Sequence, residues 1–115
     1  MNTGRFQDAV NSLETVQRQD SKPDHKVLLN LGLAFFKLKS YQKAAESFDK
    51  AAPLDSDPES YAYAGFAYDN AGNPTLAREA YAKYLAKDPD GTLAPLVKEV
   101  MAGKAKAPTA ETFEI

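Results

Sequence analysis

Apolar side chains recur along this chain at the three- and four-residue spacing of an amphipathic helix. The clearest series lies within residues 24–38 and consists of Leu28, Leu31, Phe35 and Leu38. A second series begins at Tyr41 and predicts a helix to about residue 52, which Pro53 ends because proline cannot donate the helical hydrogen bond. Residues 24–57 are therefore expected to form two helices joined by a short turn.

The same pattern returns 33 residues later, since Gly32 corresponds to Gly65 and Phe48 to Tyr81. Residues 58–91 therefore predict a second helix pair. Its second helix is expected to begin at Pro74, because the preceding residue, Asn73, is a good N-cap and proline is favoured at the first helical position. A fixed period of this size indicates stacked helical repeats.

The two corresponding glycines stand inside predicted helices, where glycine costs roughly 1 kcal/mol relative to alanine. That cost is explained if a neighbouring helix crosses so closely that a Cβ at Gly32 or Gly65 would have no room. We therefore expect large side chains of the partner helix to pack around small residues at these crossings.

The N-terminal residues 1–20 match only the second helix of a repeat, with Phe6 corresponding to Tyr41 and Leu13 to Phe48. A helix without its partner leaves apolar surface uncovered. We expect either that the chain is the C-terminal part of a longer array or that a second copy supplies the missing helix.

After the second pair, residues 92–103 predict a terminal helix with Thr92 as its cap and Pro95 in its first turn. Residues 104–115 show no helical period, and we expect them to form a flexible tail.

Both copies follow the same order. A large residue stands four positions before a glycine, and an aromatic residue, a turn, a small alanine and a second aromatic residue come after it. This order resembles the tetratricopeptide repeat family. The second copy departs from the family pattern, with Ala64 in place of leucine and Pro74 where an aromatic residue is usual. The resemblance implies an all-α fold, a right-handed superhelical stack of antiparallel helix pairs with a C-terminal capping helix. It also implies a protein–protein interaction module, an adaptor or scaffold that binds a partner's peptide or helix.

In this family the first helix of each repeat lines a concave groove. The helical winding then predicts the residues that face it, with apolar side chains contacting the partner and polar side chains orienting it. For the apolar floor of this groove the alternative is packing between adjacent repeats, and that floor consists of Leu29, Leu33, Phe36, Tyr63 and Phe66. The predicted groove residues are Lys26, Leu29, Asn30, Leu33, Phe36, Lys37, Glu59, Ala62, Tyr63, Phe66, Asp69 and Asn70.

The composition narrows the range of partners. The net charge is −2 with acidic and basic residues interspersed, and the lack of a basic stripe argues against nucleic acid. No apolar run reaches the ~20 residues that span a bilayer, which argues against direct membrane insertion. With no cysteine, disulfides and thiolate chemistry are excluded, and both the cytoplasm and the periplasm are compatible with the sequence.

Candidate chemistry is sparse. His25 is the only histidine and lacks metal-ligand spacing, while Asp55, Asp57 and Glu59 lack the glycine and closing glutamate of a calcium loop. No acid, base and nucleophile converge, so we expect no enzyme, no cofactor and no metal. Two alternatives to the groove-binding module remain. One is a self-assembling structural domain that forms homo-oligomers through the N-terminal half-repeat. The other is an accessory domain of a larger enzyme or of a secretion or assembly complex.

Overall fold

The computed structural model describes residues 3–19, 25–54 and 58–112, and every described regular element is helical. The helices are α1 (Thr3–Gln19), α2 (His25–Lys37), α3 (Tyr41–Ala51), α4 (Glu59–Asn70), α5 (Pro74–Lys87) and α6 (Ala94–Met101), with a short 3-10 turn η1 (Ala52–Leu54) after α3. The all-α repeat fold predicted from the sequence is therefore confirmed. The sequence also favours Asp24 and Asp57 as N-caps of the first helix of each pair, and both residues lie outside the described residues.

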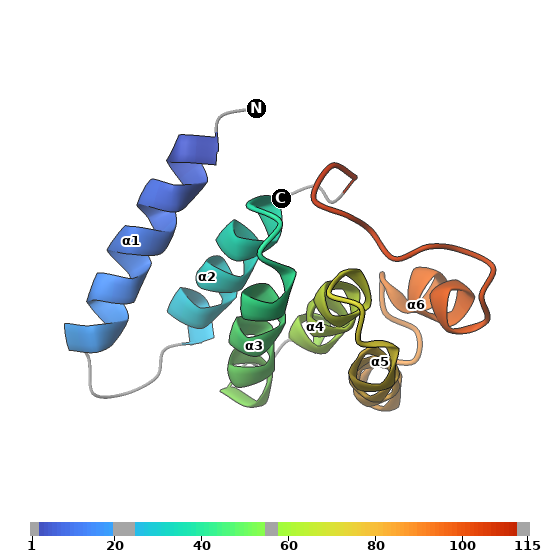
Figure 1. Cartoon of the computed structure of the whole chain (residues 1–115). Coiled ribbons are helices and arrows are strands. Elements are labelled where there is room, and N and C mark those ends of the chain that lie inside the picture. The colour runs from blue at the N-terminus through green and yellow to red at the C-terminus, as the bar shows by residue number, and fades with distance from the viewer. Residues whose placement is uncertain (1–2, 20–24, 55–57, 113–115) are drawn as a thin grey trace.

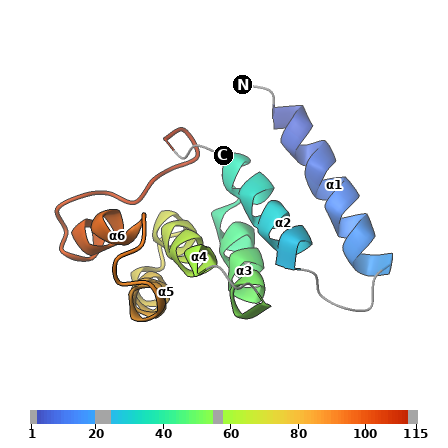
Figure 2. The ribbon, with the colours of Figure 1, turned by 180° about the vertical axis from the view of Figure 1, so that it is seen from behind.

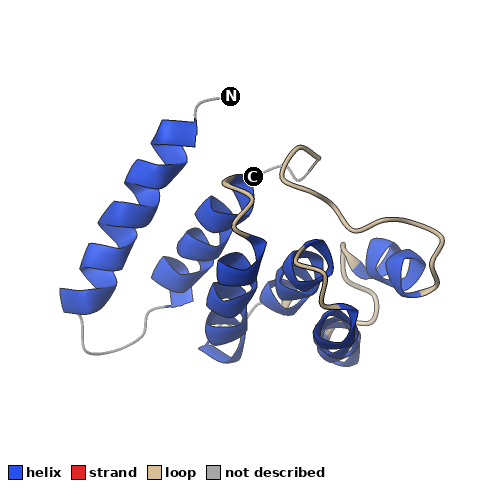
Figure 3. Ribbon diagram, viewed as in Figure 1, coloured by secondary structure: helices blue, strands red, loops and turns tan. Residues whose placement is uncertain are grey.

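The first five helices form a row in which each lies beside the next, so that α2–α3 and α4–α5 are the two predicted pairs (Figures 1 and 3). Helix α6 lies against α5 at the far end of the row. One apolar core joins α2 to α6, and its largest fully buried side chains include Phe48, Tyr81 and Tyr84. Burial of these aromatic rings supplies much of the driving force for stacking the pairs.

The two mid-helix glycines mark the closest crossings, as predicted. A Cβ built on Gly32 would lie 2.6 Å from Cδ1 of Phe48, and one built on Gly65 would overlap the ring of Tyr81. In both pairs the aromatic ring of the second helix lies directly against the glycine of the first helix. The 33-residue period therefore reproduces one packing contact, rather than only a sequence pattern.

Three helices end in the same way. After α2, α4 and α6, the residue that follows the last turn has a positive φ: 63° at Lys39, 83° at Gly72 and 76° at Gly103. The amide of the next residue returns to a carbonyl five residues earlier, as in the bond from Ser40 N to Phe35 O (2.9 Å). This is the Schellman ending, for which glycine is the usual residue, so a lysine at position 39 is strained.

Helix starts follow the predictions in part. The Asn73 side chain accepts a hydrogen bond from the amide of Leu76 (3.4 Å) and Pro74 opens α5, as expected. Thr92 was expected to cap the last helix. This prediction was wrong, because α6 begins only at Ala94 with Leu93 at the cap position and no side-chain cap. Instead the amide of Leu93 donates to the hydroxyl of Tyr84 (3.1 Å), which anchors this turn to α5.

Helix α1 packs on α2 through a small separate apolar cluster centred on Val10, which is buried together with Leu31 and Ala34. Its half-buried side chains Ala9 and Leu13 pack against the same cluster. Over residues 5–15, where side chains are described, no large apolar side chain is fully exposed. The apolar surface that we expected on the half-repeat is thus partly covered by α2.

The segment after α6 runs back across the row towards the adjoining ends of α2 and α3 (Figures 1 and 2). It contains no regular element, as the lack of periodicity predicted. Residues 104–112 are hydrogen-bonded to α2, α3 and α4, and the methyl group of Ala110 is buried. The expected flexibility of this tail stays a prediction. Residues 113–115 lie outside the described residues.

Candidate functional site

The predicted groove residues divide by their exposure. Lys26 and Asn30 are exposed on α2. Seven others are half-buried and still present part of their surface: Leu29, Leu33, Lys37, Glu59, Tyr63, Asp69 and Asn70. These side chains lie on the first helices of the two pairs, α2 and α4.

Phe36, Ala62 and Phe66 were expected to form part of the groove floor, but each is buried in the core. The ring of Phe36 meets Tyr41 edge-on at a centroid distance of 5.2 Å, and the ring of Phe66 lies 5.9 Å from that of Tyr81. These first helices have neighbours on two sides, so more than one stripe of each helix is buried. These three side chains therefore belong to the core, and the ring contacts of Phe36 and Phe66 lie within their own helix pairs.

The polar groove residues of α4 have partners within the chain. The hydroxyl of Tyr63 donates to Glu59 (3.0 Å), and the carboxylate of Asp69 accepts from Tyr81 (2.6 Å). Burial together with this carboxylate raises the pKa of the Tyr81 phenol well above its usual range. These groups therefore fix the surface of α4 and are held in place before any partner arrives.

An open hollow of about 360 Å³ lies between α1 and α2. Its lining is mostly apolar and consists of Phe6, Ala9, Ser12, Leu13, Asn30, Leu33 and Ala34. Two predicted groove residues, Asn30 and Leu33, thus meet side chains of α1 that the groove prediction did not include. The correspondence of Phe6 with Tyr41 and Leu13 with Phe48 was the sequence signal that could have placed them there.

The repeat symmetry explains this hollow. One repeat later, the positions that correspond to Ala9, Ser12 and Leu13 are Ala44, Ser47 and Phe48, and all three are buried. There, α2 covers α3, with Gly32 against Phe48 and Phe36 against Tyr41. The hollow is therefore the place on α1 that a first helix would fill, and we call it the helix slot, defined by Phe6, Ala9, Ser12, Leu13, Asn30 and Leu33.

A second feature lies at the C-terminal ends of α2 and α4, where the returning segment is bound. Nζ of Lys37 donates to the carbonyl oxygen of Ala110 (3.1 Å), and the amide of Ala110 donates to the hydroxyl of Tyr41 (3.1 Å). Nδ2 of Asn70 donates to the carbonyl oxygen of Pro108 (2.7 Å). The sequence placed Lys37 and Asn70 on the groove and gave Tyr41 only as the start of the second helix.

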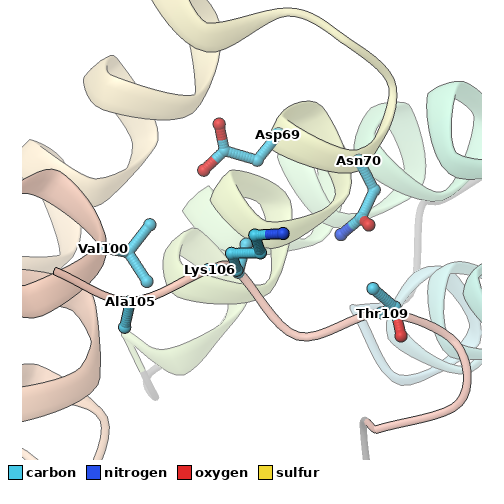
Figure 4. A pocket seen from close by; sticks show the side chains of 7 residues that line it. Asp69, Asn70, Val100, Ala105, Lys106 and Thr109 are labelled. Atoms are coloured by element: carbon cyan, nitrogen blue, oxygen red, sulfur yellow. The ribbon is translucent and has the colours of Figure 1, made fainter. Parts of the chain in front are cut away.

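Between α6 and this anchoring point the segment spans a second hollow of about 340 Å³. Figure 4 shows Asp69 and Asn70 on α4, Val100 on α6 and the side chains of Ala105, Lys106 and Thr109 around it. The segment is therefore held at its far end by hydrogen bonds, while Ala107 in its middle packs partly against the core beside the hollow.

Over residues 3–19, 25–54 and 58–112, no group of three or more acidic, histidine or cysteine side chains is placed to hold a metal ion. Within the same ranges, none of the helices combines the length and the apolar character needed to cross a bilayer. The features that remain are the two surfaces just described.

Comparison with protein families agrees with this architecture. A tetratricopeptide repeat model matches residues 1–61, and a second tetratricopeptide repeat model matches residues 59–91. The chain therefore belongs to the tetratricopeptide repeat family, whose repeats generally mediate protein–protein interaction. Neither the curated proteins nor the solved structures gave a match.

Proposed function

We propose that this chain is a protein–protein interaction module that binds an apolar helix of its partner in the helix slot between α1 and α2. The observation that carries this proposal is the correspondence between the slot and the α2–α3 contact, where a helix fills the equivalent position. The slot combines half-buried apolar side chains with exposed Asn30 at its rim, which suits an amphipathic helix in a groove.

The partner helix is expected to present a small residue to the slot. In both complete pairs a glycine of the first helix meets an aromatic ring of the second. At the equivalent place on α1 stands Leu13, a smaller side chain than Phe48, so an alanine-sized residue fits there as well. Remaining groove residues on α2 and α4, such as Lys26 and Tyr63, would orient the rest of the partner.

The proposal is tested by affinity capture from a lysate of the source organism, followed by binding of the identified partner in purified form. Leu33→Glu places a charge in the slot and should abolish binding. Leu54→Glu is the matched control, because Leu54 is 47% exposed and lies on η1, away from the slot. Circular dichroism must show both variants folded, and retention of the partner by a folded Leu33→Glu variant would contradict the proposal.

The same slot also favours self-assembly, since the helix that fills it can come from a second copy. Light scattering over a range of concentrations distinguishes a slot filled by another protein from a slot filled by a second copy of this chain. A mass that rises with concentration in the wild type, and no longer rises with Leu33→Glu, would identify the slot as a homo-oligomer contact.

A further inference from the structure

The returning segment presents a compact turn to the repeats. Within Thr109–Thr112, the amide of Thr112 donates to the carbonyl of Thr109 (3.2 Å), and the amide of Thr109 donates to the Thr112 hydroxyl (2.8 Å). This closed turn holds the Ala110 main chain towards α2 and α3. On the segment, the hydrogen bonds with Lys37, Asn70 and Tyr41 use only main-chain atoms of residues 108 and 110. These bonds therefore do not select for particular side chains at residues 108 and 110.

Two residues of the segment restrict which side chains can bind here. The side chain of Ala110 is only 1% exposed, so a much larger residue cannot take its place. Next to it, the carboxylate of Glu111 lies 2.6 Å from Nζ of Lys39. Lys37, Lys39 and Lys43 stand within seven residues of one another, so this end of α2 and α3 is basic in a chain whose net charge is −2.

The segment is also weakly enough held to be replaced. Between residues 104 and 112 only the side chain of Ala110 is fully buried, Ala107 is partly buried against the core, and an open hollow lies beside the segment. Local opening is least costly where few apolar contacts are buried, so this segment can leave without unfolding the helices. Lys39 meanwhile keeps a strained positive φ at a position where α4 and α6 have glycine, and such strain often marks a binding site.

We propose that Lys37, Lys39, Tyr41 and Asn70 form a peptide-recognition site, separate from the helix slot. Its ligand is a turn-forming segment with an alanine-sized residue directly before an acidic residue. The chain's own residues 108–112 occupy this site as an intramolecular ligand, and a partner segment of the same chemistry binds by displacing them.

The test uses the full chain and a fluorescent synthetic peptide of residues 104–115. The Ala110→Trp variant cannot seat its own segment and leaves the site open. An intramolecular segment competes at an effective concentration near the millimolar range. We therefore expect the peptide to bind Ala110→Trp at least ~10-fold more tightly than it binds the wild type, as measured by fluorescence anisotropy.

Four further comparisons make the test specific. The same peptide carrying Ala110→Trp should not bind, and Lys37→Met with Asn70→Leu in the Ala110→Trp chain should abolish binding of the unchanged peptide. Glu111→Lys, a change of an exposed side chain that leaves the core untouched, should open the site as Ala110→Trp does. Its matched control is Glu99→Lys on α6, also exposed, which should behave as the wild type.

Peptide that binds no variant, or that binds wild type and Ala110→Trp equally, would overturn the proposal. A wild-type dimer that dissociates in the Ala110→Trp variant would also overturn the proposal, because the segment would then bind a second copy of the chain. None of these results bears on the helix slot, since the Leu33→Glu comparison tests that surface alone.

Discussion

The ammonium group of Lys37 donates a hydrogen bond to the carbonyl oxygen of Ala110, a residue 73 positions further along the chain, across 3.1 Å. Through this contact the segment after the last helix comes back to the first complete repeat. Two of the residues predicted for the groove, Lys37 and Asn70, are therefore bonded to the chain's own segment. The end of α2 and the Schellman turn that follows it place Lys37 and Lys39, and both lysines contact the segment.

The ion pair between Lys39 and Glu111 makes the docking of the segment sensitive to acid. The hydrogen bond from Lys39 lowers the pKa of the Glu111 carboxyl below its usual value of 4.5. A lowered pKa means that the stabilising contribution is complete above pH 4.5 and is lost as the pH falls through the lowered value. Both groups are exposed, so salt should weaken the effect. The chemical shift of the Ala110 amide should stay constant between about pH 6 and 8 and move at acidic pH.

Glu111→Gln is the control for this pH dependence. Its Ala110 amide signal should show no acid transition in the same range. A wild-type transition that survives in Glu111→Gln would assign the effect to another carboxylate.

The crossing at Gly65 should tolerate no added methyl group. Gly65→Ala places a Cβ within the ring of Tyr81, which is buried and fixed by its bond to Asp69. Overpacking of this kind costs about 1–3 kcal/mol, which outweighs the roughly 1 kcal/mol that alanine gains in a helix. Urea denaturation should therefore show a less stable variant. The double variant Gly65→Ala/Tyr81→Leu should lose less free energy of unfolding than the two single variants lose in sum. If the two losses simply add, the contact between position 65 and the Tyr81 ring is contradicted.

Two tyrosines should resist ionisation in the folded protein. Burial, together with hydrogen bonds to Asp49 and Asp69, raises the pKa of Tyr68 and of Tyr81 well above 10.0. A phenol with a raised folded-state pKa contributes stability that is complete below pH 10.0 and is lost as the pH rises towards the folded-state value. Ultraviolet titration should thus show part of the tyrosine signal appearing only as the protein unfolds. Tyr81→Phe should reduce this late fraction, and a single transition near pH 10 for all tyrosines would contradict the assignment.

The docking of α1 depends on one small cluster. Val10 is buried against Leu31 and Ala34, so Val10→Asp places an unpaired charge there and should release α1. The helical signal should fall in proportion to the 17 residues of α1, while the core shared by α2 to α6 remains. Asn11→Asp, a neighbouring change on the exposed side of the helix, should leave the spectrum unchanged. Loss of all helix in Val10→Asp would show that α1 belongs to the main cooperative unit.

Local signals in the sequence predicted most of the fold. Helix α5 spans Pro74–Lys87 as expected, because Asn73 and Pro74 specify its start without help from the rest of the molecule. The glycine crossings were predicted because a mid-helix glycine has a cost that only a close neighbour explains. The cap at Thr92 was predicted wrongly, since Tyr84 binds the amide of Leu93 and moves the start of α6.

The candidate site was harder to predict, for a physical reason. Helical winding separates one face of a helix from another, but it does not count how many neighbours the helix has, and so Phe36 and Phe66 were assigned to a surface. The segment after α6 is held by contacts with residues 38 to 73 positions away, which leave no period in its own sequence. The repeat correspondence of Phe6 with Tyr41 and of Leu13 with Phe48 pointed to α1, but the lining of the helix slot emerged from comparing the buried positions of α3 with the half-exposed positions of α1.

We propose that the slot between α1 and α2 holds a helix from another protein. The most direct test places a photo-crosslinking phenylalanine analogue at position 30, on the rim of the slot, and at position 83 on the exposed side of α5. Irradiation in cells of the source organism should give an adduct with a partner of defined mass at position 30 and none at position 83. No adduct at position 30, or the same adducts at both positions, would contradict the claim.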